Sequence, residues 1–378
     1  MAKYRLGDIA PVCQGMVADS NQCWLLNLDV VESNTGKILE YVYVDHSQIG
    51  ASTVSFDKMN VLYSKLRPYL NKVVLPDRAG YATSEMLPLR PNEQVITREY
   101  LTYFLRSPHF VKYINGKTSG AKMPRANIAD LKAVEIECPS IMEQNRITTQ
   151  FDLITRVIEK RQKELSTFDN LIKARFVELF GDPVSNPKGW EKKALSEEAE
   201  IKIGPFGSLL HKEDYITGGH ALVNPSHIVD GKIAPDDKLT ISDEKYNELS
   251  AYHLRTGDVV MGRRGEMGRC AVVEQPGLLC GTGSLLIRTN GDLSADYIQK
   301  IISFPSFKRT IEDMAVGQTM PNLNVPIVSA FQIIKPPKSV QNQYYSFVAQ
   351  VDKSKAVVQK ALDKAQLLFD SLMQKYFG

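Results

Sequence analysis

Two stretches of the chain carry apolar residues at every seventh position. The first stretch has two interleaved registers, which are Phe151, Ile158, Leu165, Ile172 and Leu179, and Ile154 and Phe168. The second also has two, which are Val351, Val358, Ala365 and Leu372, and Val348, Leu362, Phe369 and Tyr376. Interleaved heptads are typical of the seam of a coiled coil. The pattern therefore predicts two long helices that pack against each other as an antiparallel pair.

The sequence also marks the ends of the first helix. Ser140 and Glu143 have the spacing of a capping box, in which two side chains bond the free amides of the first turn. Gly181, followed by two prolines, is typical of a helix end. The helix is thus about 40 residues long and spans about 60 Å at 1.5 Å per residue. The segment GDPVSNPKG (181–189) is then predicted to be a linker.

The second half of the chain repeats the first. GAKMPRAN (120–127) returns as GQTMPNLN (317–324), an offset of 197 that holds without a gap to the last residue. An offset of 198 extends the match upstream, where YSKLRPYLNKVVLP (63–76) aligns with MGRRGEMGRCAVVE (261–274). The chain is therefore a tandem duplication of a segment of about 180 to 190 residues, far longer than the units of solenoid repeats. Such a duplicate can fold with an approximate two-fold axis.

The parts outside the helices are predicted to be mixed α/β domains. Short apolar runs bounded by turn residues predict strands, as in NKVVLP, VEIECP, DVVMG, CAVVE and FQIIKPP. REYLTYFLRSPHFVKYI and ADYIQKIISFPSFKRTI predict helices that are interrupted at equivalent prolines. The expected fold class is α/β (α+β). Its expected parts are a first domain (1–140), a first long helix (141–181), a linker with the second domain (182–337) and a second long helix (338–378).

Composition narrows the kind of protein. A chain of 378 residues that is 43% apolar is expected to form two or three globular domains. No apolar run approaches the roughly 20 residues that cross a membrane, and the start MAKYRLGD lacks the apolar core of a signal peptide. We therefore expect a cytoplasmic protein without membrane contact. The five cysteines include no CxxC pair, which argues against a zinc site or a disulfide framework.

Motifs for catalysis are weak. GKT (116–118) lacks the first glycine of a phosphate-binding loop, because Val111 stands in its place. NPSH (224–227) lacks the second proline and the aromatic residue of the NPPY tetrapeptide of amino-methyltransferases. Asp182 with EKK (191–193) has the residue types of a nuclease site, but lies in a linker where charges are solvated. The sequence thus predicts no catalytic residues, no metal and no cofactor.

Positive charge is concentrated locally, although the net charge is only +3. Between Glu99 and Asp130 the chain has no carboxylate and five basic residues, which are Arg106, Lys112, Lys117, Lys122 and Arg125. Aromatic residues are interleaved with them. Such a segment could lie along DNA phosphates. The alternative is a solvated helix face whose aromatic side chains are buried.

Two loops at equivalent positions carry residue types that read DNA bases. The first contains Lys65, Arg67, Tyr69, Asn71 and Lys72. The second contains Arg263, Arg264, Glu266 and Arg269. Arginine reads guanine, asparagine reads adenine, and glutamate accepts from cytosine. Because the loops share a position but differ in chemistry, they suit two readers of different DNA sequences. In the repeated GxxMPxxN segments, and at Lys117 just before the first of them, we expect further contacts, namely from Lys117, Lys122, Arg125, Thr319 and Asn322.

Asn127 and Asn324 have a structural interpretation. The GxxMPxxN segments are predicted to mark the return from a helix to the last strand of each domain. Glycine and proline suit a tight turn there, and asparagine side chains bond backbone groups.

At this point the chain resembles a known family. The features that carry the resemblance are the duplication with terminal long helices, GPFGS (204–208) followed by KEDY (212–215), the MPRAN and MPNLN loops, and the junction LFGDPVSNPKGW. Across essentially the whole chain they resemble the specificity subunit of type I restriction-modification systems. One departure lies in the first repeat, where Arg125 and Ala126 replace the asparagine and aliphatic residue of MPNLN.

The resemblance implies two target-recognition domains that each read one half of a bipartite double-stranded DNA target. It implies that the antiparallel helices separate these domains and dock two modification subunits, and that restriction subunits join the full complex. The residues assigned to partner binding on this basis are Phe151, Ile158, Leu165, Ile172, Val351, Val358, Leu362 and Phe369. Two alternatives stay open, a coiled-coil scaffold without DNA contact and a stand-alone DNA-modifying enzyme.

Overall fold

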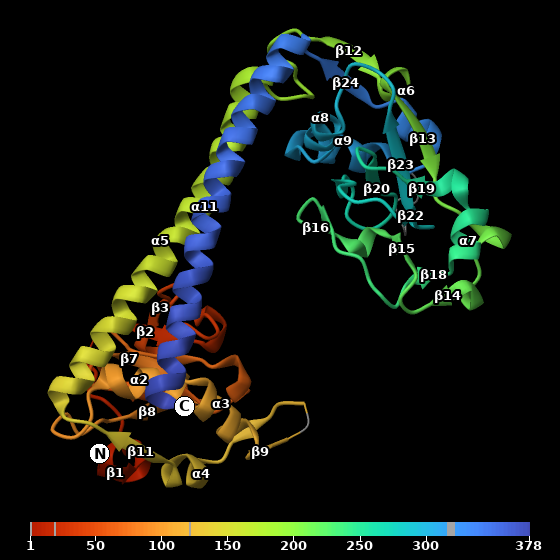
Figure 1. The fold of residues 1–378 in the computed structure, drawn as a ribbon. Coiled ribbons are helices and arrows are strands. Elements are labelled where there is room, and N and C mark those ends of the chain that lie inside the picture. The colour runs from red at the N-terminus through yellow and green to blue at the C-terminus, as the bar shows by residue number, and fades with distance from the viewer. Residues whose placement is uncertain (1, 19, 121, 316–321) are drawn as a thin grey trace. The chain divides into compact units, whose positions relative to one another are not determined.

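The computed structural model describes residues 2–18, 20–120, 122–315 and 322–378. The chain forms two compact units. Unit 1 is Met1–Ser166 together with Lys355–Gly378, and unit 2 is Thr167–Ser354. Each unit contains one mixed domain of helices and strands and a part of each long helix (Figure 1). The predicted fold class is therefore confirmed.

The domain of unit 1 is built from short strands and short helices. Its strands are β1 (Ala2–Arg5), β2 (Gln22–Leu26), β3 (Tyr43–Asp45), β4 (Thr53–Phe56), β5 (Val61–Ser64), β6 (Val73–Val74), β7 (Gly80–Thr83), β8 (Met86–Leu89), β9 (Thr118–Ser119), β10 (Arg125–Ala126) and β11 (Glu135–Cys138). They form sheets in the orders β3-β2-β7-β4, β6-β5-β8, β1-β11 and β10-β9. The helices are α1 (Leu6–Ile9), α2 (Arg98–Arg106), α3 (Pro108–Asn115) and α4 (Ile128–Ala133).

The domain of unit 2 has a related set of elements. Its strands are β12 (Glu191–Ala194), β13 (Ala199–Ile203), β14 (Tyr215–Ile216), β15 (His220–Val223), β16 (Ile228–Val229), β17 (Lys232–Ile233), β18 (Thr240–Ile241), β19 (His253–Leu254), β20 (Val259–Gly262), β21 (Cys270–Val272), β22 (Leu278–Cys280), β23 (Ser284–Thr289) and β24 (Gln332–Lys335). The sheet orders are β13-β23-β20-β21, β14-β18-β15-β22-β19, β12-β24 and β16-β17. The helices are α6 (Leu195–Glu198), α7 (Asp243–Glu248), α8 (Ala295–Ile302), α9 (Pro305–Met314) and α10 (Val325–Ser329).

The duplication extends to strand pairing. In unit 1, β5 pairs antiparallel with β8, and Val61 lies opposite Leu89. In unit 2, β20 pairs antiparallel with β23, and Val259 lies opposite Ile287. Both residues of the second pair stand 198 positions after those of the first. In each domain the first strand also pairs with the last, as β1 with β11 and β12 with β24. The two repeats therefore share a strand register as well as a sequence pattern.

The predicted interruption of the helices at proline is confirmed. Helix α2 ends at Arg106 and α3 begins at Pro108, where the Ser107 side chain accepts from the amide of Phe110. Helix α8 ends at Ile302 and α9 begins at Pro305. Proline fits the first position of a helix because it has no amide hydrogen to satisfy there.

The GxxMPxxN segments do not lead directly into the last strand, as the sequence suggested. A short helix intervenes in each unit, α4 in the first and α10 in the second. The Asn127 side chain accepts from the amide of Ala129 at 2.8 Å, and the Asn324 side chain accepts from Ile327 at 3.0 Å. Both asparagines are thus N-caps, which confirms their structural interpretation.

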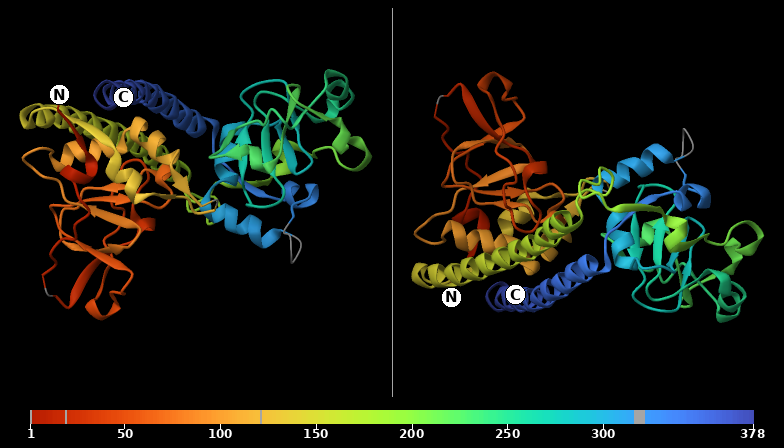
Figure 2. Two further views of the ribbon diagram at one scale, coloured as in Figure 1. Left: turned by 90° about the horizontal axis from the view of Figure 1, so that it is seen from below. Right: turned by 90° about the horizontal axis from the view of Figure 1, so that it is seen from above.

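The long helices are α5 (Ile141–Phe180) and α11 (Lys338–Phe377), each of 40 residues. Figures 1 and 2 show α5 in yellow to green and α11 in blue. In unit 1, Phe151 near the start of α5 contacts Phe377 at the end of α11. In unit 2, Phe180 at the end of α5 contacts Tyr344 near the start of α11. The pairing is therefore antiparallel in each unit.

The predicted capping box at the start of α5 forms only in part. The Ser140 hydroxyl accepts from the amide of Glu143 at 3.3 Å. The carboxylate of Glu143 instead accepts from the guanidinium of Arg146 at 2.7 Å, one turn further along the helix. At the other end, Gly181 has a φ of 76°, the left-handed conformation that ends a helix.

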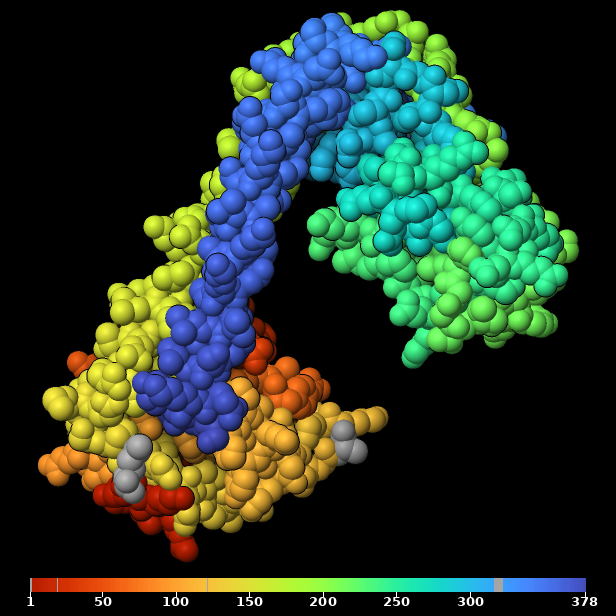
Figure 3. Space-filling model, in the orientation of Figure 1, coloured from red at the N-terminus to blue at the C-terminus, as the bar shows by residue number. Residues whose placement is uncertain are grey.

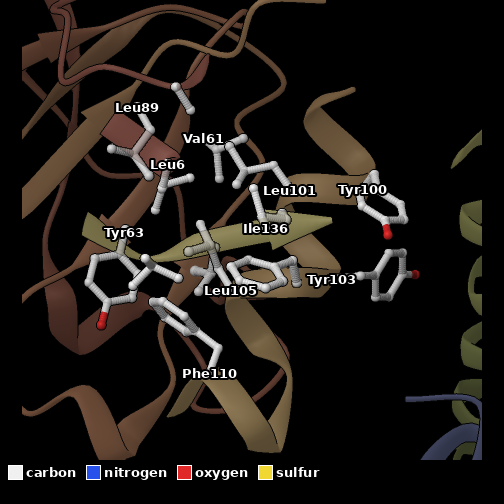
Figure 4. Close-up of a cluster of buried hydrophobic side chains, with 14 of the residues drawn as sticks. Leu6, Val61, Tyr63, Leu89, Tyr100, Leu101, Tyr103, Leu105, Phe110 and Ile136 are labelled. Carbon is white, nitrogen blue, oxygen red and sulfur yellow. The ribbon is translucent and has the colours of Figure 1, made fainter. Parts of the chain in front are cut away.

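The core of unit 1 fixes the strand that precedes the first predicted DNA-contacting loop. Figure 4 shows Val61 and Tyr63 of β5 among side chains of α1, α2 and β11. Val61 is fully buried, and the ring of Tyr63 lies edge-on to Phe110 of α3. Burial of these side chains removes apolar surface from water and holds the strand in place. The loop after β5 therefore starts from a rigid support.

Candidate nucleic-acid interface

The same two segments meet in each unit. We call residues 65–72 and 263–269 the reading loops, and residues 120–127 and 317–324 the return loops. In unit 1, the amide of Arg67 donates to the Pro124 carbonyl at 2.7 Å, and the amide of Ala126 donates to the Lys65 carbonyl at 2.8 Å. The reading loop and the return loop of unit 1 are thus joined through their backbones.

Unit 2 repeats this junction. The amide of Leu323 donates to the carbonyl of Arg263 at 2.9 Å, at the position equivalent to the bond between Ala126 and Lys65. Isolated β-bridges join Leu66 to Arg125 in unit 1 and Arg264 to Asn322 in unit 2. The structure therefore brings together two predicted DNA-contacting segments that lie about 60 residues apart along the chain.

Two residues of the first reading loop have intrachain roles. The side-chain amide of Asn71 donates to the carbonyl of Arg106 at 3.0 Å, and the ammonium of Lys72 donates to the carbonyl of Leu28 at 2.6 Å. Asn71 also has a φ of 50°, which asparagine tolerates better than most residues. These two side chains shape the loop from within the domain.

Arg67 and Tyr69 occupy the middle of the same loop. Arg67 has a φ of 48°, a left-handed conformation that is uncommon for a long side chain. Pro68–Leu70 then form a 3₁₀ turn between Arg67 and Asn71. Tyr69 is 52% exposed, so its ring is open to solvent. Arg67 and Tyr69 thus lie where the loop turns, and Tyr69 is open to a ligand.

The basic residues in and beside the first return loop differ in their surroundings. Arg125 donates through Nε and Nη2 to Oε1 of Glu85, at 2.9 and 2.8 Å. Lys65 of the reading loop lies 4.0 Å from the other oxygen of the same carboxylate. Lys117 pairs with Asp130 at 3.2 Å and lies over the ring of Tyr113, whereas Lys122 is exposed.

In the second reading loop, Arg263 is held by a neutral partner. Its Nε donates to Oδ1 of Asn322 at 3.0 Å. Burial, together with the charge of Arg264, lowers the pKa of Arg263. Arg264 itself is exposed. Thr319, the remaining residue predicted in the second return loop, lies outside the described residues.

Glu266 is engaged on both carboxylate oxygens. Arg269 donates to Oε2 at 2.6 Å, and Lys308 donates to Oε1 at 3.1 Å. These bonds lower the pKa of Glu266, and Arg269 also donates to the carbonyl of Pro225 at 3.2 Å. Contact of Glu266 with a cytosine amino group would therefore require its ion pairs to open.

Glu85 and Lys308 are charged residues of these surfaces that the sequence motifs did not reveal. Glu85 lies in the turn between β7 and β8, outside every motif, and Lys308 lies on α9. Glu85 and Gly283 occupy equivalent positions in the two repeats. The backbone carbonyl of Glu85 accepts from the amide of Lys65 at 2.9 Å, and the backbone carbonyl of Gly283 accepts from the amide of Arg263 at 3.0 Å.

The residues assigned to partner binding are buried or half-buried on α5 and α11. Phe151 is fully buried and Val351 is 6% exposed, so intrachain packing occupies both side chains. The others are half-buried, namely Ile158, Leu165, Ile172, Val358, Leu362 and Phe369. The large apolar side chains that these helices expose are different ones, namely Met142, Leu153, Val157, Leu171, Val177, Val357, Leu367 and Leu368.

The acidic residue of one weak catalytic motif has a structural role. Oδ1 of Asp182 accepts from the amides of Val184 and Ser185 at 2.9 and 3.0 Å, so this carboxylate shapes the linker turn. Within 2–18, 20–120, 122–315 and 322–378, no three His, Cys, Asp or Glu side chains cluster in a way that suits a metal ion. None of the helices in these ranges has the length and apolarity needed to span a bilayer.

Comparison with known proteins identifies the family. The family model described as the type I restriction modification DNA specificity domain matches residues 1–167 and again 187–366. The chain therefore belongs to this family. It is a DNA-recognition subunit with two repeated domains and no catalytic role of its own, and catalysis belongs to partner subunits of the restriction-modification complex. The scaffold and enzyme alternatives receive no support.

Individual relatives agree with this assignment. Over 370 residues the chain is 22% identical to the type I restriction enzyme MjaIX specificity subunit of Methanocaldococcus jannaschii. This alignment covers 89% of this chain and 82% of the relative. Over 136 residues it is 24% identical to the EcoDI specificity subunit of Escherichia coli, covering 36% of this chain and 30% of the relative.

Solved structures show the same fold. The S subunit of a type I restriction-modification system from M. genitalium aligns with a TM-score of 0.58 at 15% identity, over 100% of this chain and 96% of that one. A chain from work on "complex assembly and conformational transition of the type I R-M system" aligns with a TM-score of 0.65 at 17% identity, over 100% and 97%.

Proposed function

We propose that each domain reads one half of a bipartite double-stranded DNA target through its reading and return loops. The observation that carries this proposal is the repeated junction between these loops, with equivalent backbone bonds but different side chains. In unit 1 the loops present Arg67, Tyr69 and Lys122, whereas in unit 2 they present Arg263 and Arg264. A shared backbone frame with different donors suits two readers of different base sequences, because base identity is read by side chains at groove edges.

The charges of the loops suit a position against DNA. Lys65, Lys117 and Arg125 in unit 1 and Arg269 in unit 2 are held in ion pairs, from which they can turn to phosphate oxygens. Phosphate contacts fix the register of a protein on the duplex without reading its sequence. We assign these four residues to the backbone and Arg67, Arg263 and Arg264 to base edges. We also propose that the protein acts in the cytoplasm.

We further propose that α5 and α11 dock two modification subunits through their exposed apolar side chains. Atoms of α11, drawn in blue, are visible in the space-filling view (Figure 3). Leu367 and Leu368 on α11 are 67% and 50% exposed, and Val157 on α5 is 45% exposed. Exposed apolar side chains grouped along a helix are typical of a protein interface. Restriction subunits would join the assembly through the modification subunits or beside them.

The reading of separate half-sites is tested by exchanging one domain. Replacing residues 190–337 with the equivalent domain of a relative is expected to change one half of the methylated sequence and leave the other half unchanged. The measurement is the mapping of methylated bases in a host genome that carries the chimaera with its modification subunits. A change in both halves would refute modular reading, and a loss of all methylation with intact assembly would show that the halves are not read independently.

The docking proposal predicts a loss of assembly from exposed positions. Replacing Leu367 and Leu368 together by aspartate is expected to weaken binding of a modification subunit by at least tenfold, because desolvated charge at an interface is costly. Gel filtration or calorimetry with the purified subunits measures the effect. The matched control is Gln350→Asp and Gln359→Asp, which adds the same two negative charges at exposed polar positions of the same helix. Unchanged binding by the leucine variant would place the docking surface elsewhere.

A further inference from the structure

One carboxylate in unit 1 lies between two cations that we assign to DNA phosphates. Oε1 of Glu85 accepts from both Nε and Nη2 of Arg125, and its other oxygen lies 4.0 Å from the Lys65 ammonium. Lys65 belongs to the reading loop and Arg125 to the return loop, so Glu85 links the two segments. The guanidinium group of Arg125 binds carboxylate and phosphate oxygens with the same donors. Glu85 therefore occupies donors that a DNA phosphate would use.

The exposure of the three side chains allows exchange. The Arg125 side chain is 46% exposed, whereas those of Glu85 and Lys65 are 21% and 22% exposed. Arg125 can thus turn outward while Glu85 remains at its place in the turn between β7 and β8. Oε2 of Glu85 is buried and has no hydrogen-bond partner among the described residues. The carboxylate is consequently an acceptor with unmet capacity, which strengthens its hold on nearby cations.

Unit 2 lacks this carboxylate at the equivalent position. Gly283 stands there, and its carbonyl accepts from Arg263 as that of Glu85 accepts from Lys65. A side chain on Gly283 would begin within 3.0 Å of Pro225, so the position is crowded. Asn322, the equivalent of Arg125, holds Arg263 through a neutral amide oxygen. A carboxylate that joins the two loops by pairing with a cation of each is therefore found in unit 1, whereas in unit 2 the carboxylate of the reading loop, Glu266, pairs with Arg269 and Lys308.

We infer that Glu85 is an internal competitor for DNA phosphate that lowers the sequence-independent affinity of unit 1. This inference rests on the proposed function. Binding to DNA of any sequence comes from cations that neutralise phosphates and release counterions. Because Glu85 pairs with Arg125 and Lys65, these two cations are less available to DNA phosphates. Stable binding then depends more on base contacts, and a complex searching a genome is retained less by DNA that lacks its target.

The test is Glu85→Gln, which keeps the shape of the side chain and removes its charge. The full chain assembled with its modification subunits is titrated against a random-sequence duplex between 50 and 200 mM salt. The variant is expected to bind the random duplex about 3- to 10-fold more tightly than the parent at 50 mM salt. Between 50 and 200 mM salt, its affinity is expected to fall by a further factor of about 3, relative to the parent, for each additional phosphate that it neutralises. Adding Arg125→Gln should abolish most of this increase in affinity, because that variant lacks the freed cation.

Two controls separate the explanations. Glu137→Gln makes the same charge change on β11, where Glu137 pairs with Lys3 at 3.3 Å, and is expected to leave DNA affinity within about twofold. Thermal unfolding of Glu85→Gln checks that the junction of the loops survives. If Glu85→Gln binds the random duplex no more tightly than the parent, the inference is wrong. It is equally wrong if the variant loses affinity only for the target duplex, because Glu85 would then be a base reader.

Binding by the parent complex separates a failure of the role of Glu85 from a failure of the proposed DNA-reading function. If the parent complex binds neither the random duplex nor a duplex containing the methylated sequence, the proposed DNA-reading function fails. If the parent complex binds both and Glu85→Gln does not differ from it, only the role of Glu85 fails.

Discussion

Phe151→Ala is expected to lower the free energy of unfolding of unit 1 by about 3 to 5 kcal/mol, the range for truncation of a fully buried phenylalanine. Phe151 is completely buried and stacks on Tyr103 of α2 with ring centroids 4.7 Å apart. Its ring also lies 5.3 Å from Phe369 and 5.9 Å from Phe377 of α11. One side chain thus joins the domain of unit 1 to both long helices, and its removal leaves a cavity that three elements would have to fill.

The measurement can be made specific for unit 1. The chain has two tryptophans, Trp24 and Trp190, and Trp24 is buried in the domain of unit 1. With Trp190→Phe as background, fluorescence during urea unfolding reports on unit 1 alone. Leu153→Ala is the control, because Leu153 lies on the same helix but is 57% exposed; a change within about 0.5 kcal/mol is expected. If Phe151→Ala lowers the free energy of unfolding by less than about 1 kcal/mol, the remaining aromatic side chains must fill the space that the ring leaves.

The long helices were predictable because their signals are local. Heptad spacing, Ser140 and Gly181 fixed the extent of the first helix, and α5 spans Ile141–Phe180. The same holds for the interruption before Pro108 and Pro305, where the proline ring itself sets the start of the next helix. Such features depend on neighbours within a few residues, which a single sequence displays directly.

The direction of polar side chains could not be predicted in the same way. Asn71 and Lys72 have residue types that suit DNA, yet their donors bond the carbonyls of Arg106 and Leu28. A buried carbonyl and a phosphate oxygen place the same demand on a donor, so composition does not distinguish them. The heptad residues assigned to partner binding show the same difficulty, because an apolar seam looks alike whether the partner is the same chain or another subunit.

Charged partners from distant segments were also beyond the sequence. Glu85 neutralises Arg125 across 40 positions of the chain, and Lys308 reaches Glu266 across 42. Both contacts depend on the order of strands in the sheets and on the placement of α9. The periodicity of apolar residues in the sequence predicts neither of these. The duplication predicts where the two proposed reading surfaces lie, but differences in their electrostatics arise from residues outside the repeated motifs.

The second large effect concerns the spacing of the two halves of the DNA target. Each long helix begins in one compact unit and ends in the other, with the boundaries after Ser166 in α5 and after Ser354 in α11. If this pair holds the two recognition domains apart, its length sets the distance between the half-sites. A heptad inserted into each helix after these residues keeps the apolar seam in phase, because it adds one whole sequence repeat. A four-residue insertion at the same places breaks the phase and is expected to damage assembly.

Each inserted heptad lengthens its helix by about 10 Å at 1.5 Å per residue, and DNA advances about 3.4 Å per base pair. The double insertion is therefore expected to widen the unread gap in the methylated sequence by up to about 3 base pairs, while the bases read in each half stay the same. Tilt of the helix pair against the DNA makes the widening smaller, and the complex must absorb the added rotation between half-sites. Methylation mapping of a host that carries the heptad variant measures the gap. An active variant with an unchanged gap would mean that the helices dock partners but do not measure DNA.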